Sequence, residues 1–257
     1  MSLLRESFAG ISGRFHLAGL YAVSQLMLRL IYSSALTRPE IAMLGLFAMI
    51  LIHAVGCGIR GMVFHAAAGL PPVPGLAPRY AMALFLPLFW LETKVGFLVL
   101  AGAGGMMGIH RLFYGEASTQ QALETVLFWG EPLLELGAAL LLLYSVPVCI
   151  AARAAGRWRP HLRAGLSYFR IGGPQTRRLI APLAGLALLQ VGLLTLIGRE
   201  AANGEPGIPM ALALLVRSYL MLVVLYGASR IVVAHERALA AVPRDGSSQP
   251  PHDEQPS

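Results

Sequence analysis

The stretch TVLFWGEPLLELGAALLLLYSVPVCI, residues Thr125–Ile150, is apolar along nearly its whole length and carries only two charges, Glu131 and Glu135. A helix of about 20 apolar residues is long enough to cross the hydrocarbon core of a bilayer, which is about 30 Å thick. Apolar residues cover every side of this stretch, whereas a helix on the surface of a soluble protein keeps one polar face. The stretch therefore predicts a transmembrane helix with two carboxylates inside the membrane.

Five further apolar runs accompany this one. The predicted spans are Leu17–Leu36, Ile41–Ile59, Tyr80–Ala101, Thr125–Ile150, Leu179–Ile197 and Ile208–Val232. The 257-residue chain is 56% hydrophobic and only 13% charged, whereas soluble domains carry about 25% charged residues. The sequence therefore predicts an all-α fold, a polytopic transmembrane bundle of about six spans that forms one domain over residues 1–242. The polar, proline-rich segment 243–257 is predicted to be a disordered cytoplasmic tail.

The arginines are distributed unevenly along the predicted bundle. With the N-terminus inside, the cytoplasmic segments hold 14 arginines, including Arg60 directly after the second span, and the opposite loops hold only Arg38, Arg111 and Arg199. Cytoplasmic loops carry the excess of basic residues in membrane proteins. The distribution predicts that both termini are cytoplasmic and that the chain lies in a bacterial-type inner membrane. Such a location also explains the net charge of +7 without nucleic acid as a partner.

Six charged residues fall inside or at the edge of the apolar runs, three positive and three negative. They are Arg29, Glu92, Lys94, Glu131, Glu135 and Arg217. The direction of each span places all six between the bilayer centre and the outer face. A charge at this depth costs several kcal/mol unless it is paired or faces water. Two interpretations remain open: a polar site that binds a substrate or an ion, or a charge-neutral network that pairs helices.

The spacing of these charges limits how they can pair. Glu131 and Glu135 are four residues apart and share one face of their helix, where Arg217 is a plausible partner. Glu92 and Lys94 are only two residues apart, about 200° around a helix, so they cannot face the same partner. Each of them therefore needs a neighbour on another span.

The segment Ala151–Arg178 between the fourth and fifth spans is strongly basic. It contains no acidic residue and seven arginines, Arg153, Arg157, Arg159, Arg163, Arg170, Arg177 and Arg178. Leu162, Leu166 and Phe169 recur at a helical spacing, which predicts an amphipathic helix. The segment is a candidate docking surface for a partner subunit or for anionic lipid. Alternatively, its arginines only hold the loop on the cytoplasmic side.

Motifs for catalysis or for cofactor binding are not evident. His53 and His65 are 12 residues apart, about 120° out of phase on one helix, which argues against a bis-histidine haem. Cys57 and Cys149 are predicted to lie near cytoplasmic helix ends as free thiols. We therefore expect no metal, no cofactor and no catalytic residues. An enzyme is less expected than a non-enzymatic membrane protein.

Three functional hypotheses follow from this pattern. The first is a small permease, or the membrane subunit of a transporter, with the intramembrane charges as its polar site. The second is a structural subunit of a secretion-type or conjugation-type envelope complex, with the bilayer and protein subunits as partners. The third is an intramembrane lipid-modifying enzyme, which the absence of a catalytic motif disfavours.

Overall fold

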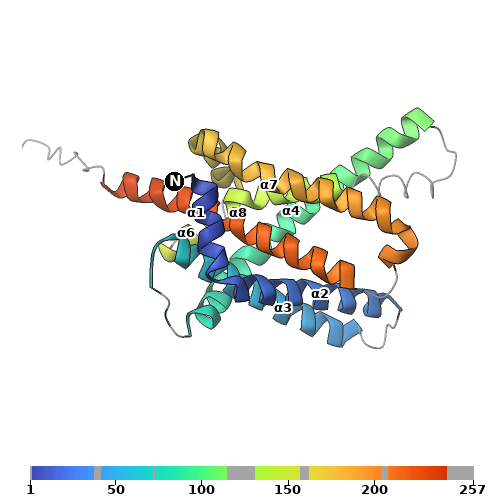
Figure 1. Cartoon of the computed structure of the whole chain (residues 1–257), viewed down its shortest axis with the longest axis horizontal. Coiled ribbons are helices and arrows are strands. Elements are labelled where there is room, and N and C mark those ends of the chain that lie inside the picture. Colours follow the sequence, from blue (N-terminus) through green and yellow to red (C-terminus); the bar gives the residue numbers. More distant parts are fainter. Residues whose placement is uncertain are drawn as a thin grey trace, which may run out of the picture.

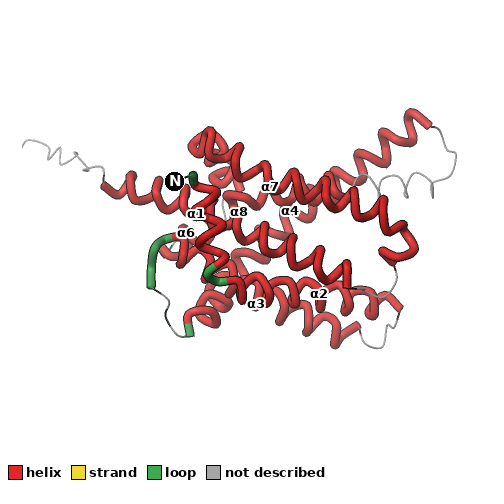
Figure 2. Tube along the Cα trace, in the orientation of Figure 1, coloured by secondary structure: helices red, strands yellow, loops and turns green. Residues whose placement is uncertain are grey.

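The part of the chain that the structure describes is entirely helical in its regular secondary structure (Figure 2). The computed structural model describes the backbone at residues 2–37, 42–71, 73, 75–114, 131–156, 162–203 and 208–241, and the side chains there except at 29, 32–37, 42, 113–114, 131–132, 189–203 and 208–211. Its helices are α1 (Leu3–Ser12), α2 (Phe15–Thr37), α3 (Ala42–Ala67), α4 (Leu76–Tyr114), α6 (Glu131–Ala154), α7 (Leu162–Asn203) and α8 (Ile208–Ala241). The predicted all-α class is confirmed. The predicted tail 243–257 lies outside the described residues.

Four helices are long and apolar enough to cross a membrane within the described ranges. The spans are Met43–Ala67, Leu76–Leu112, Leu133–Ala154 and Leu212–Ala241, in α3, α4, α6 and α8. The outer side of α3 is one example of an apolar surface on these helices. Met43, Leu44, Phe47 and Leu51 are 65% to 71% exposed there, a pattern suited to lipid rather than to water. α2 and α7 run along the first and fifth predicted spans. The total of six spans and the cytoplasmic termini stay predictions.

Several helices extend beyond their predicted ends. α3 continues past Ile59 to Ala67, and α4 continues past Ala101 to Tyr114. The 39 residues of α4 span roughly 58 Å at 1.5 Å per residue, about twice the thickness of the hydrocarbon core. Its C-terminal part projects away from the other helices (Figure 1). Apolar content predicts where a chain crosses lipid, but a helix can continue into water beyond that point.

α7 differs most from the prediction. It begins at Leu162, so the basic segment is largely helical and continuous with the fifth predicted span. Gly173 has a φ of +47°, a left-handed conformation, and Pro174 follows it. Gly adopts this conformation without a Cβ clash, and proline is common just after it. α7 is therefore one continuous helix with a local backbone irregularity at Gly173.

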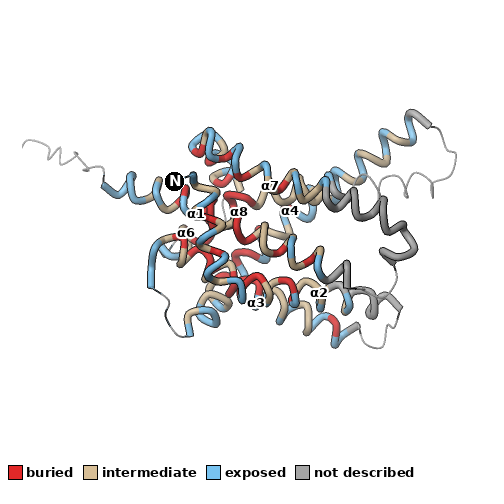
Figure 3. The backbone as a smooth tube through the Cα atoms, in the orientation of Figure 1, coloured by how far each residue is buried: buried red, intermediate tan, exposed pale blue. Residues whose placement is uncertain are grey.

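α8 is the central helix of the bundle and packs against α1, α2, α3, α6 and α7. Buried positions run along it, while the described C-terminal ends of α4 and α8 are mostly exposed (Figure 3). One apolar cluster joins α6, α7 and α8, and a second joins α1, α2, α3 and α8. A third joins α3, α4 and α6 around Leu84, Leu88 and Leu91. These contacts fix the relative positions of α3 and α4, which carry the charged groups described next.

α1 is a short helix whose sequence gave no membrane signal. The Ser2 side chain caps its first turn by accepting from the Arg5 backbone N–H at 3.4 Å. Ser7 and Ile11 are buried, and Arg230 Nη2 of α8 lies 3.2 Å from Glu6 Oε2. Packing against α8 and this ion pair hold α1 against the bundle.

Candidate functional site

His53, Cys57 and Arg60 of α3 lie on one face of that helix, at positions i, i+4 and i+7. Cys57 is fully buried, and its Sγ lies 3.5 Å from His53 Nε2. His53 Nε2 also lies 3.3 Å from the backbone oxygen of Phe85 in α4. The ring edges of Phe85 and Phe89 enclose the imidazole, with centroids 5.0 Å and 6.0 Å away. This face of α3 is therefore polar and is turned toward α4.

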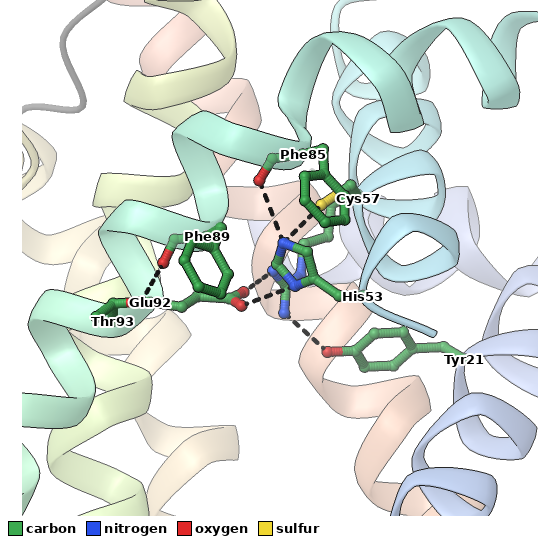
Figure 4. Close-up of polar contacts among 8 residues, drawn as sticks. Tyr21, His53, Cys57, Phe85, Phe89, Glu92 and Thr93 are labelled. Atoms are coloured by element: carbon green, nitrogen blue, oxygen red, sulfur yellow. Dashed lines mark hydrogen bonds and ion pairs between the residues drawn. The ribbon is translucent and has the colours of Figure 1, made fainter. Parts of the chain in front are cut away.

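Glu92 of α4 bridges two of these groups. Its Oε1 accepts from Arg60 Nη1, and its Oε2 lies 3.2 Å from His53 Nδ1. Helical side chains lean toward the N-terminus of their own helix, and α3 and α4 are joined by a short connection that makes them antiparallel. Arg60 and Glu92 therefore lean toward each other along the axis and meet at the level of His53. Figure 4 shows Glu92 reaching from α4 to the imidazole.

Tyr21 of α2 completes the group from a third helix. Arg60 Nη2 donates to Tyr21 Oη at 3.3 Å, and the guanidinium carbon lies 6.0 Å from the centroid of the Tyr21 ring. The side chains of His53 and Arg60 are each 18% exposed and that of Glu92 is 27% exposed. We call His53, Arg60, Glu92 and Tyr21 the charged cluster. Three helices contribute to it, so it forms only when the bundle is assembled.

A cavity of about 60 Å³ lies against the charged cluster. Arg60 and Tyr21 form its polar wall, and nine apolar residues form the rest. Among these are Leu142 and Val146 of α6, Leu183 of α7, and Met221, Leu222 and Leu225 of α8. Leu142 and Leu225 lie at the middle of their helices. The cavity is therefore central in the bundle, with a cation on one side and apolar groups elsewhere.

The six predicted intramembrane charges do not form one site among the described side chains. Glu92 belongs to the charged cluster, whereas Arg217 Nη2 pairs with Glu135 Oε2 at 3.1 Å in a separate contact between α8 and α6. The sequence predicted that Arg217 would pair with the helix face that carries Glu131 and Glu135. The contact with Glu135 on α6 agrees with that prediction. Lys94 was predicted to need a neighbour on another span, but it is exposed, and no ion pair of Lys94 is found among the described side chains. The side chains of Arg29 and Glu131 lie outside the described residues.

Sequence reasoning missed His53, Arg60 and Tyr21 as members of the site. Arg60 was assigned to a cytoplasmic flank, whereas the structure places it seven residues before the end of α3, within the candidate span Met43–Ala67 and against Glu92 of α4. A charge in an apolar run ends a predicted span, but here Glu92 neutralises it and the helix continues. The spacing of His53, Cys57 and Arg60 on one helical face was the signal available in the sequence.

The basic segment differs in detail from its prediction. Arg163, Arg170, Arg177 and Arg178 are exposed on α7, whereas Arg153 is partly buried in α6, and Arg157 and Arg159 lie outside the described residues. Leu162 and Phe169 pack against the core, but Leu166 is 43% exposed. The buried face instead follows Gly165, Tyr168, Gly172 and Thr176. The two glycines on this face allow α7 to approach α6 closely. The buried face of the segment is therefore less apolar than the face of leucine and phenylalanine that the sequence predicted.

No protein-family model matches the sequence, and no curated protein or solved structure shows significant similarity to it. Within the described ranges, no three His, Cys, Asp or Glu residues converge as a metal site would require. Cys57 and Cys149 are both free and buried. A functional assignment therefore rests on the charged cluster and the cavity beside it.

Proposed function

We propose that the chain is a small membrane permease, or the membrane subunit of a transporter, and that the charged cluster is its polar site. The observation that carries this proposal is the cavity at the centre of the bundle, which has Arg60 and Tyr21 as its polar wall. Ionisable residues at membrane depth face the bundle interior or a water-filled cavity and often mark a pathway for a solute or a proton. An ion pair that only joins two helices has no need of such a cavity.

This site uses only Glu92 of the six charges that the sequence singled out. The sequence placed the polar site in the outer half of the bilayer, among Arg29, Glu92, Lys94, Glu131, Glu135 and Arg217. The Arg217–Glu135 pair is more exposed than the charged cluster, at 36% and 30%, and neither residue lines the cavity. We therefore assign the transport site to the charged cluster and a helix-pairing role to Arg217 and Glu135. The bacterial-type inner membrane stays the proposed location.

A test of this function that needs no known solute is the accessibility of the cavity from the two sides of the membrane. Ala139 lines the cavity and has a small side chain. We expect a thiol introduced by Ala139→Cys, in a Cys57→Ala, Cys149→Ala background, to react with a membrane-impermeant methanethiosulfonate from both sides. A permease exposes its site alternately to each side, whereas a structural subunit does not.

The matched control is Leu51→Cys in the same background. Leu51 lies near the middle of α3 and is 67% exposed on the outer side of the bundle. A thiol in lipid stays protonated and unreactive toward this reagent, because only the thiolate is a nucleophile. We expect Leu51→Cys to remain unlabelled. If Ala139→Cys is labelled from neither side, in protein that remains monodisperse, the permease proposal is overturned in favour of a structural subunit.

A further inference from the structure

The protonation of His53 determines the net charge of the charged cluster. Its Nδ1 faces a carboxylate oxygen of Glu92 and its Nε2 faces the backbone oxygen of Phe85. Both oxygens only accept hydrogen bonds, so the doubly protonated imidazolium satisfies both contacts at once. In that form the cluster has two cations, His53 and Arg60, and one carboxylate, Glu92. One positive charge is then left without a counter-ion among the described side chains.

Arg60 presents this positive charge to the cavity. A guanidinium has five N–H donors, and the contacts to Glu92 and Tyr21 use one on each Nη nitrogen. Three N–H donors therefore remain on a side chain that lines the cavity, and planar carboxylates match this donor geometry well. The Tyr21 hydroxyl lies beside the guanidinium and can also donate to such a ligand.

The size and lining of the cavity restrict the ligand further. The cavity has a volume of about 60 Å³, so it accepts only a small ligand. The wall away from Arg60 is apolar, and Met221, Leu222 and Leu225 form one side of it. A hydrated inorganic ion gains little from such a wall, whereas a short hydrocarbon tail gains from leaving water.

We infer that the cavity binds a short-chain monocarboxylate, with the carboxylate on Arg60 and Tyr21 and the alkyl tail among the leucines and Met221. This inference rests on the proposed permease function and names the substrate class of the same site. Propionate and butyrate, with five and six non-hydrogen atoms, are small members of this class. The bound anion supplies the counter-charge that the cluster lacks when His53 is protonated.

Binding of the carboxylate is coupled to binding of a proton. With His53 protonated, the cluster and its ligand are together neutral; with His53 neutral, the same complex carries one negative charge. The described titratable or charged groups around His53 are Cys57 and Arg60 on α3, Glu92 on α4, Tyr21 on α2 beyond Arg60, and Cys149 of α6 in the same apolar cluster as Cys57. The ligand therefore binds the protonated form more tightly, and by linkage it promotes proton uptake.

The experiment is equilibrium binding of radiolabelled butyrate to the purified full chain in lipid nanodiscs between pH 6 and pH 10, where butyrate is ionised. We expect affinity to fall as the pH rises, by at most about tenfold per pH unit, the limit for one linked proton. Arg60→Gln should weaken binding at pH 6 by more than tenfold. His53→Gln should bind weakly and without this pH dependence. The matched control Arg230→Gln removes an arginine that pairs with Glu6 away from the cavity, and should bind as the native chain does.

A second variant tests the cavity without removing a charge. Met221→Ala enlarges the apolar end of the cavity, so we expect it to shift the preference from butyrate to hexanoate at least tenfold. No butyrate binding by folded native protein at any pH, equal binding by Arg60→Gln, or tighter binding of chloride than of butyrate would each overturn the inference. Two-sided labelling of Ala139→Cys together with absent butyrate binding would leave the permease proposal standing and reject only this substrate class.

Discussion

Replacing Glu92 with leucine is expected to destabilise the folded chain by about 3–5 kcal/mol, the usual effect of removing one partner from a buried ion pair. Glu92 is the described counter-charge of Arg60 and also accepts from His53. Without it, the Arg60 guanidinium stays charged inside the bundle, with Tyr21 as its remaining hydrogen-bond partner among the described side chains. SDS-induced unfolding in mixed micelles, followed by circular dichroism, measures the change.

The double variant Arg60→Leu, Glu92→Leu separates charge imbalance from loss of packing. Replacing both members of a buried ion pair with apolar residues is often neutral or stabilising. We therefore expect the double variant to recover most of the stability that Glu92→Leu loses. A Glu92→Leu variant within about 0.5 kcal/mol of the native chain, the range of ordinary surface substitutions, would contradict the ion pair.

The second large effect is expected at Gly165, where α7 crosses α6. A Cβ at this position would lie 2.3 Å from Ser145 Oγ and 2.6 Å from Ser145 Cα. Rotation of a side chain cannot relieve a contact with a backbone atom, so the two helices must move apart. We expect Gly165→Ala to destabilise the protein by about 1–3 kcal/mol, the usual cost of overpacking. The same unfolding assay detects it.

Gly185 provides the matched control on the same helix. No described atom lies within 4 Å of the position that its Cβ would occupy. Alanine has the higher helix propensity, by up to about 1 kcal/mol, so Gly185→Ala should be neutral or slightly stabilising. If Gly165→Ala behaved like Gly185→Ala, the close approach of α6 and α7 would be wrong.

The fold class could be predicted from the sequence because it depends on a pattern that is local in the chain. Apolar runs near 20 residues indicate membrane helices whatever their neighbours are, and α3, α4, α6 and α8 follow four of them. Helix ends were less predictable. Arg60 ended a predicted span, whereas the helix α3 continues to Ala67, and the charge that neutralises Arg60 comes from another helix. The apolar run that contains Arg60 gives no sign of a neutralising charge on another helix.

The site was predictable only in part, for a related reason. Glu92 was identified, because an acidic residue in an apolar run is unusual wherever its partner lies. Its partners His53 and Arg60 depend on the way α3 and α4 pack, and the sequence alone did not give that packing. The prediction that Arg217 faces the Glu131/Glu135 side needed less information, because it only matched charges of opposite sign at similar depth. In the structure, Arg217 Nη2 lies 3.1 Å from Glu135 Oε2.

The central claim is that the charged cluster serves transport and does more than join α3 to α4. The most direct test compares methanethiosulfonate labelling of Ala139→Cys in two otherwise identical backgrounds, one with the native cluster and one with Arg60→Leu, Glu92→Leu. The double variant is expected to fold, so the comparison reports on the charges rather than on assembly. We predict labelling from both sides with the native cluster and at most one-sided labelling without it. Equal two-sided labelling in both backgrounds would contradict the claim and leave the charges with a structural role only.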